Sequence, residues 1–141
     1  MKKIDDVKVS ICCLTFNHEK YIDRCLKSLL MQKTDFKFEI IIHDDASTDR
    51  TIEIIKTYAQ QYPDIIKVIV EEENQYTIGG ISHIYCSRIY PYAQGKYVAY
   101  CEGDDFWTDP LKLQKQQFIF CSFCSFLCSR FSCSFFYFFT I

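Results

Sequence analysis

Three acidic side chains, Glu102, Asp104 and Asp105, lie within a stretch of four residues. They directly follow residues 97–101, an apolar run of the kind that forms buried strands. Like charges at this spacing repel one another, and a divalent cation with oxygen ligands is the usual relief. A solvated acidic turn is the plain alternative, so the rest of the chain has to decide between the two interpretations.

Apolar and amphipathic segments alternate along the chain to about residue 116, and these segments must position the acids. Near-continuous apolar runs predict buried strands at residues 7–14, 36–42, 65–70 and 97–101. Apolar residues at helical spacing predict helices at about residues 22–31, 47–62, 81–93 and 109–116. The predicted N-caps are Asn17 for the first helix, with Glu19 in its first turn, Ser47 or Thr48 for the second, and Asp109 for the last. This order predicts an α/β fold, with a mostly parallel sheet and flanking helices.

Polar side chains follow three of the four predicted strands. Thr15–Asn17 follows the first strand, Asp44–Asp45 the second, and Glu102–Asp105 the fourth. In parallel sheets of this kind, ligands bind at the carboxyl ends of the strands. The three groups are therefore predicted to meet at one edge of the sheet and to form a site.

The composition indicates a single globular domain without nucleic-acid partners. The chain has 141 residues, 49% of them apolar, and its formal net charge of −2 implies no nucleic-acid binding. Five of the nine cysteines lie in apolar periodic segments and are expected to act as small hydrophobes: Cys12, Cys13, Cys25, Cys86 and Cys101. Since no signal peptide is visible, the predicted location is the cytoplasm, where thiols stay reduced.

Residues 117–141 differ abruptly in composition from the preceding chain. This tail is rich in Phe, Cys and Ser, holds nine of the thirteen phenylalanines and has no acidic residue. Its length would allow a membrane span, but Arg130 near its middle would cost about 2.5–3.5 kcal/mol on insertion. We therefore divide the chain into a domain at 1–116 and a tail at 117–141. The tail is interpreted as a non-native extension, such as the product of a shifted reading frame.

The residues after the first strand argue against several nucleotide-binding classes. A dinucleotide-binding enzyme needs a glycine-rich turn there, but residues 15–19 read Thr-Phe-Asn-His-Glu, and the chain has neither GxGxxG nor a P-loop sequence. A phosphoacceptor receiver would carry its acids after the first and third strands, which this chain does not. Side-chain recognition of a nucleotide, with a metal ion on its diphosphate, is the remaining interpretation.

Four ordered segments carry a more specific pattern. They are VSICCLTFN at 9–17, YIxxCLxSLxxQ at 21–32, EIIIHDDASTD at 39–49 and GKYVAYCEGDDFWTDP at 95–110. In these segments the chain resembles the family 2 glycosyltransferases with the GT-A fold. The resemblance covers about residues 7–116. It implies a Rossmann-like nucleotide-sugar-binding domain that is truncated with respect to the family.

The resemblance also implies roles for individual side chains. The residues implied to line the base and ribose, or to reach the nucleoside, are Thr15, Phe16, Asn17 and Glu19. Asp45 would accept a hydrogen bond from a base N–H. Asp105 would ligate Mg²⁺ or Mn²⁺, and Asp104, near the ribose and diphosphate, is the second candidate ligand. A divalent ion would stabilise the charge that develops on the leaving nucleoside diphosphate.

Other conspicuous side chains are interpreted as structural. Asp44 is expected to bond local backbone N–H groups, and Trp107 to be a core or pocket-wall aromatic. Glu102 stands where the family pattern has its first aspartate, which leaves its contact with the metal open. Residues 71–73 are expected to form a solvated acidic surface. Three scattered histidines are not expected to bind metal: His18, His43 and His83.

The implied activity is that of an inverting glycosyltransferase in polysaccharide or cell-surface glycan synthesis. Its donor would be a UDP-linked sugar, its acceptor a glycan or a lipid-linked glycan, and its location the inner face of the membrane, as a peripheral protein. The reaction needs a general base, which the family supplies after the acidic segment, yet this sequence has no Asp or Glu after Asp109. We therefore expect nucleotide-sugar binding with little or no transfer. A non-catalytic nucleotide-sugar-binding module is the alternative, and a nucleotidyltransferase is disfavoured because no basic loop stands near the start of the chain.

Overall fold

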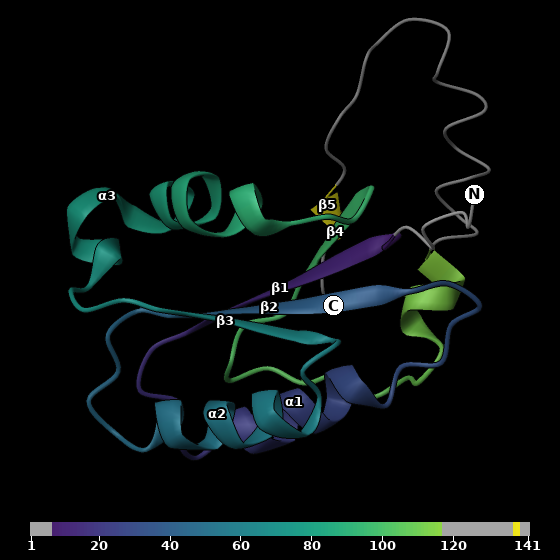
Figure 1. Cartoon of the computed structure of the whole chain (residues 1–141), viewed down its shortest axis with the longest axis horizontal. Coiled ribbons are helices and arrows are strands. Elements are labelled where there is room, and N and C mark those ends of the chain that lie inside the picture. Colours follow the sequence, from purple (N-terminus) through teal and green to yellow (C-terminus); the bar gives the residue numbers. More distant parts are fainter. Residues whose placement is uncertain (1–6, 117–136, 139–141) are drawn as a thin grey trace, which may run out of the picture.

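The computed structural model describes residues 7–116 and 137–138, and Figure 1 shows its layered form. A sheet forms the middle layer, and helices cover both of its faces. The predictions made for the tail at 117–141 lie outside the described residues, apart from residues 137–138.

The strands form one sheet in the order β3-β2-β1-β4-β5, and every neighbouring pair is parallel. The bounds are Val9–Thr15 for β1, Phe38–Asp44 for β2, Ile66–Val70 for β3, Tyr97–Tyr100 for β4 and Tyr137–Phe138 for β5. The predicted α/β fold with a parallel sheet is confirmed. The sequence does not predict β5, because a pair of residues is too short to show a strand period.

The helices lie on opposite faces of the sheet. Helices α1 (Ile22–Leu30) and α2 (Thr51–Gln61) cover one face. The other face is covered by α3 (Gln75–His83), the π-helix η1 (Ile84–Ile89) and the 3₁₀ turn η2 (Tyr90–Tyr92), as Figure 1 shows. The helix predicted at 81–93 is confirmed for residues 81–92, which form the end of α3, η1 and η2, but the helical region starts earlier, at Gln75, and Gly80, with φ of 69°, is a non-helical kink inside α3.

Two hydrophobic cores lie on the two faces of the sheet. Four of the five cysteines expected to act as small hydrophobes are buried: Cys12, Cys13, Cys25 and Cys101. Burial, with the nearby Glu39 carboxylate, raises the pKa of Cys12 to about 12, so its thiol stays protonated at neutral pH. Cys86 is exposed and the prediction is wrong for it, because Ile84 and Ile89 are the η1 residues that pack against the sheet.

Two of the predicted helix caps are wrong. Asn17 has a left-handed φ of 54°, a conformation that asparagine tolerates, and α1 begins several residues later at Ile22. Helix α2 begins at Thr51 with Arg50 as its N-cap residue, so neither Ser47 nor Thr48 caps it. Asn17, Ser47 and Thr48 instead form hydrogen bonds between the loop after β1 and the loop after β2.

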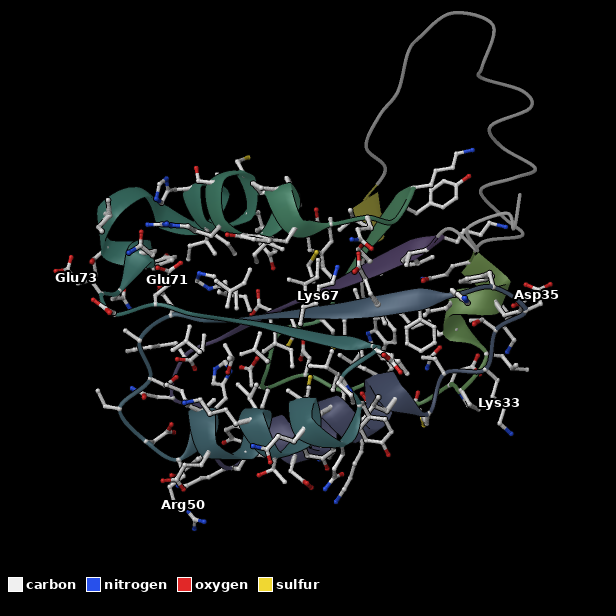
Figure 2. The ribbon with its side chains drawn as sticks, in the orientation of Figure 1. Lys33, Asp35, Arg50, Lys67, Glu71 and Glu73 are labelled. Carbon is white, nitrogen blue, oxygen red and sulfur yellow. The ribbon has the colours of Figure 1, made fainter. Side chains whose placement is uncertain are left out.

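A buried carboxylate fixes the start of β4. Glu39 on β2 is 3% exposed, and its Oε1 accepts hydrogen bonds from Ser10 Oγ at 2.6 Å and from Gln94 N at 2.7 Å. Its Oε2 lies 2.6 Å from Nζ of Lys67 on β3, which Figure 2 labels. Gly95 N donates to Ser10 Oγ at 2.8 Å. The network therefore ties the residues that lead into β4 to the three neighbouring strands.

Candidate functional site

The loops that follow β1 and β2 are joined by hydrogen bonds. Asn17 Oδ1 accepts from Thr48 N at 2.8 Å. Glu19 N donates to Asp49 Oδ2 at 3.1 Å, and Glu19 Oε2 accepts from Arg50 N at 3.1 Å. Glu19 therefore supports the start of α2 and does not lie in the first turn of α1, where the sequence predicts it. Asn17 and Glu19 both lie at the carboxyl edge of the sheet, with side-chain oxygens engaged by the loop after β2.

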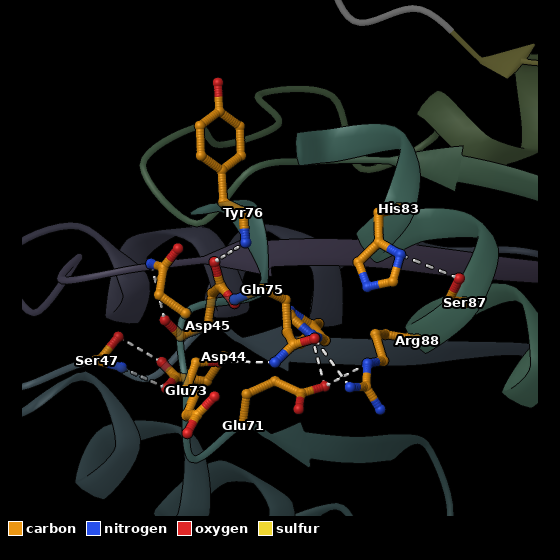
Figure 3. Close-up of polar contacts among 12 residues, drawn as sticks. Asp44, Asp45, Ser47, Glu71, Glu73, Gln75, Tyr76, His83, Ser87 and Arg88 are labelled. Carbon is orange, nitrogen blue, oxygen red and sulfur yellow. Dashed lines mark hydrogen bonds and ion pairs between the residues drawn. The ribbon is translucent and has the colours of Figure 1, made fainter. Parts of the chain in front are cut away.

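Asp44, the last residue of β2, has a structural role, as predicted. Its Oδ2 accepts from Ser47 N at 2.9 Å and its Oδ1 from Ser47 Oγ at 2.6 Å, as Figure 3 shows. Its backbone carbonyl accepts from Glu71 N at 3.0 Å. The buried Asp44 carboxylate thus orders the turn after β2.

Asp45 anchors the first turn of α3. Its side chain is buried, and its two carboxylate oxygens accept from Gln75 N at 2.6 Å and Tyr76 N at 3.1 Å (Figure 3). Asn74 Nδ2 donates to the Asp45 carbonyl at 3.3 Å, while Asn74 Oδ1 caps the helix by accepting from Thr77 N at 3.0 Å. The start of α3 is therefore held against the end of β2 by a residue about thirty positions earlier in the chain.

A cleft of about 350 Å³ lies between the end of β1 and the start of α3. Its lining residues come from both elements and from the end of β2: Leu14, Phe16, Asp45, Asn74, Tyr76, Thr77 and Ile84. Phe16 is 43% exposed and Tyr76 is 59% exposed, so both aromatic rings are available to a ligand. Figure 3 shows the Tyr76 side chain pointing away from the polar residues below it. This apolar lining suits the face of a flat group.

A group of charged and polar side chains is linked to the start of α3 through Gln75. Glu71 Oε1 lies 3.1 Å from Nε2 of the fully buried His43. It also pairs with Arg88, as Figure 3 shows, and Arg88 Nε lies 3.5 Å away. Arg88 NH2 donates to Gln75 Oε1 at 2.9 Å. The prediction of a solvated acidic surface is therefore wrong for Glu71, whose side chain is only 12% exposed, although Glu72 and Glu73 are exposed. The pairing of Glu71 cannot be predicted from the sequence, because a paired glutamate and a solvated one have the same appearance within a run of glutamates.

The acidic turn, Glu102–Asp105, lies at the carboxyl end of β4. Gly103 N donates to the Leu14 carbonyl at 2.9 Å, and Asp105 N donates to the Glu102 carbonyl at 3.0 Å. The three acidic residues of the turn are exposed, whereas Gly103 is buried against β1. Thr15, fully buried at the end of β1, directs its hydroxyl to this junction, where Oγ1 lies 3.2 Å from His18 Nδ1. The turn thus presents its carboxylates beside the end of β1.

The carboxylates of the acidic turn fit a metal ion that a ligand helps to hold. Within residues 7–116 and 137–138, no group of three or more His, Cys, Asp or Glu side chains could hold a metal ion. Mg²⁺ is usually bound through one or two carboxylates together with phosphate oxygens and water, and not by a full protein cage. Asp104 and Asp105 are the side chains whose chemistry and exposure suit that arrangement for Mg²⁺ or Mn²⁺.

Helix α1 and the residues just after it anchor the segment that follows the acidic turn. Ser28 Oγ accepts from Trp107 N at 3.0 Å. Gln32 Nε2 donates to the Asp109 carbonyl at 2.8 Å, and Gln32 Oε1 accepts from Leu113 N at 3.1 Å. Trp107 is buried in the core, as predicted. Asp109 Oδ1 accepts from Leu111 N at 2.9 Å, which is the bond of a helix N-cap, and the backbone is helical from residue 112.

Replacing Gln32 with alanine is expected to lower the free energy of unfolding by about 1–2 kcal/mol, because the buried Leu113 N–H would lose its acceptor and the Asp109 carbonyl would lose one of its two donors. Urea denaturation at pH 7 measures the change. Gln60→Ala, at an exposed position on α2, is the matched control and is expected to be neutral. Equal stabilities of the two variants would mean that Gln32 does not anchor the segment.

No helix among the described residues is long and apolar enough to cross a membrane.

The chain is similar to known proteins over most of its length. The family model described as "Glycosyl transferase family 2" matches residues 10–134. The uncharacterized protein Rv1520 of Mycobacterium tuberculosis is 45% identical over 108 residues, which cover 77% of this chain and 30% of that protein. EpsE of Bacillus subtilis is 37% identical over 109 residues, which cover 77% of this chain and 37% of EpsE.

The fold is also similar to that of a solved structure, TarS of Staphylococcus aureus. The crystal structure of Staphylococcus aureus TarS 1–349 in complex with UDP matches 82% of this chain and 32% of that chain, with a TM-score of 0.66 and 29% identity. The chain spans about a third of the length of these relatives. With matching segments, a GT-A-type parallel sheet and acids gathered at its carboxyl edge, the chain belongs to glycosyl transferase family 2.

Proposed function

We propose that this chain forms the donor-binding part of an inverting glycosyltransferase that transfers a sugar from a UDP-linked donor. One observation carries the proposal: the aromatic cleft and the acidic turn lie next to each other at the carboxyl edge of the sheet. Leu14 lines the cleft, and its carbonyl accepts the hydrogen bond from Gly103 N in the turn. A nucleotide whose base enters the cleft therefore extends its diphosphate toward the turn. The UDP in the TarS crystal structure supports uridine as the base.

In the proposed complex, the base lies against the exposed ring of Phe16. Asp45 accepts a hydrogen bond from a base N–H, since a carboxylate has about four acceptor positions and the two backbone bonds occupy only two of them. The remaining proposed contacts, to the ribose and nucleoside, come from Asn17 and Glu19, while Thr15, which the sequence also predicts to line the base and ribose, is fully buried and supports the site at the end of β1. The fixed loops of Asn17 and Glu19 mean that little ordering is needed when the nucleotide binds.

At the diphosphate end, Asp105 is the proposed main ligand of Mg²⁺ or Mn²⁺, and Asp104 the second. When bound, the ion stabilises the negative charge of the departing diphosphate. The chain itself fixes both carboxylates through the Gly103 and Asp105 backbone hydrogen bonds. It also anchors the following segment to α1, so the acidic turn is preorganised on both sides.

The proposed acceptor is a glycan or lipid-linked glycan of the cell surface, reached from the cytoplasmic face of the membrane. TarS of Staphylococcus aureus, a poly(ribitol-phosphate) beta-N-acetylglucosaminyltransferase with 33% identity over 103 residues, supports a polymer acceptor. A nucleotide-sugar-binding module without turnover is the second candidate.

Calorimetric titration of the full chain with UDP tests the shared premise. We expect binding in the presence of Mn²⁺, and an affinity lower by more than about tenfold both in EDTA and for Asp105→Asn, because a ligand of the metal is lost. Asp64→Asn is the matched control, since Asp64 is an exposed acid in the turn before β3, at the opposite edge of the sheet. Identical UDP affinities for the parent and Asp105→Asn would remove the metal site from the proposal.

A hydrolysis and transfer assay with UDP-sugars then separates the two candidate functions. Release of UDP by the parent chain, abolished in Asp105→Asn, supports the transferase. Tight metal-dependent binding with no release supports the binding module.

A further inference from the structure

His18 lies at a junction of β1, the start of α1 and the acidic turn. Its Nδ1 is 3.2 Å from Thr15 Oγ1, and its Nε2 is 4.0 Å from Asp104 Oδ2. A Cβ placed on Gly103 would lie 2.8 Å from His18 Nδ1, so the turn packs directly against the ring. The His18 side chain is 23% exposed and that of Asp104 is 49% exposed, which puts the ring between the protein interior and the carboxylate.

The other two histidines are placed differently. His43 is fully buried and pairs with Glu71. His83 lies on α3, with its Nδ1 3.4 Å from Ser87 Oγ (Figure 3). His18 is therefore the histidine that meets the acidic turn.

The hydrogen-bond chemistry of this junction favours one arrangement of protons. A neutral imidazole has one nitrogen that donates and one that accepts. If Thr15 Oγ1 donates to Nδ1, then Nε2 carries the proton and points an N–H at the Asp104 carboxylate. The opposite tautomer would turn a lone pair toward a negative group. The Asp104 carboxylate thus favours the tautomer with the proton on Nε2, and the Thr15 hydroxyl, which can donate or accept, is able to donate to Nδ1 in that tautomer.

The His18 backbone holds the ring in place. Its carbonyl accepts from Tyr21 N and from Ile22 N, each at 2.9 Å, at the start of α1. A separation of 4.0 Å between Nε2 and Oδ2 is too long for a hydrogen bond, so the attraction of Asp104 is electrostatic. Glu102 and Asp105 repel the Asp104 carboxylate from within the same turn, and the fixed imidazole opposes that repulsion.

We propose that His18 is a positioning residue for the donor site: it holds the Asp104 carboxylate of the acidic turn in the orientation that receives the metal and the diphosphate. The inference rests on the proposed function, because it assigns a supporting residue to that metal-binding turn. Groups that hold a metal-binding side chain in place commonly contribute ten- to a hundredfold, roughly, to metal affinity. His18 would therefore act on the metal-dependent part of nucleotide affinity and not on the cleft.

The test uses the full chain with three substitutions at this position. Asparagine can replace Nδ1 and accept from Thr15 but is too short to reach Asp104, whereas glutamine can present an N–H near the position of Nε2. We expect His18→Ala and His18→Asn to weaken UDP binding in Mn²⁺ by about tenfold, and His18→Gln to stay within about threefold of the parent. In EDTA, all three variants are expected to bind UDP like the parent. Thermal denaturation of each variant is expected to match the parent.

The titration has results that overturn the role of His18 and a result that overturns the proposed function. Equal affinity of His18→Asn and the parent in Mn²⁺ overturns the inference alone, as does an equal loss in Mn²⁺ and in EDTA, which would indicate a general structural role. A large loss of thermal stability in both His18→Asn and His18→Gln also overturns it. Absence of metal-dependent UDP binding in the parent overturns the proposed function and this inference with it.

Discussion

Replacing Gly103 with alanine is expected to abolish the Mn²⁺-dependent affinity for UDP and to lower the free energy of unfolding by about 2 kcal/mol. The added Cβ would lie 2.7 Å from Thr15 Oγ1 and 2.8 Å from Thr15 Cβ, far inside ordinary contact distance. Thr15 is fully buried at the end of a central strand and cannot move aside. The acidic turn must move instead, which breaks the hydrogen bond from Gly103 N to Leu14 O and displaces the turn's carboxylates from the cleft.

Calorimetry with UDP and Mn²⁺ measures the first effect of Gly103→Ala, and urea denaturation measures the second. Thr108→Ala, at an exposed position in the segment after the turn, is the control and should leave both quantities unchanged. Parent-like UDP affinity in Gly103→Ala would show that the close packing of the turn on β1 is not needed to place the metal ligands.

The sheet and its functional edge can be predicted from sequence because their signals are local. A run such as Ile40–Ile42 is buried on both faces of the sheet, so it is continuously apolar and stops where the strand reaches its carboxyl end. The side chains that follow, Asp44 and Asp45, are then placed at the edge by topology alone. The same reasoning places Thr15 after β1 and the acidic turn after β4.

The wall of the cleft could not be predicted in this way, because distant residues fix it. Two glycines follow the first turn of α3 and disfavour a helix, yet Asp45, just after β2, binds the backbone N–H groups of Gln75 and Tyr76. Asn74 as N-cap is a local signal that could have located the start of this helix. Asn17 shows the opposite case: it looks like a helix cap in sequence, but a partner thirty-one positions away, Thr48, takes its side-chain oxygen.

His18 and Glu71 have partners that a local sequence pattern cannot predict. Glu71 lies in a run of glutamates, where a solvated surface is expected, and His18 lies between the first strand and the first helix, where nothing local points to a partner. Their partners, Asp104 and Arg88, come from distant segments that only the folded sheet brings close. Residue type and spacing therefore locate the edge of the site, while the contacts that shape it depend on tertiary structure.

Replacing Glu39 with alanine is expected to destabilise the domain by about 3 kcal/mol at pH 7, because removing one partner of a largely buried charge network leaves the others unpaired. Ser10 Oγ, Gln94 N and Lys67 Nζ would all lose a partner within 2.7 Å. Glu39→Gln keeps the shape and an acceptor oxygen and should cost less. Glu53→Gln, on the exposed face of α2, is the control and should be close to neutral.

The stabilisation by Glu39 is also expected to depend on pH, in a direction that its surroundings determine. Burial alone would raise the pKa of Glu39, but the Lys67 ammonium, the Ser10 hydroxyl and the Gln94 N–H outweigh burial and hold the pKa below the ordinary 4.5. The unfolded chain then binds the proton more readily than the folded chain, so the contribution is complete above about pH 4.5 and is lost as the pH falls through the lower folded value. Urea denaturation from pH 7 to pH 3 should therefore show the stability gap between the parent and Glu39→Gln narrowing only below about pH 4.5. A gap that stays constant over this range would mean that the Glu39 charge adds nothing to the stability of the fold. In that case, shape and hydrogen bonding alone would hold the start of β4.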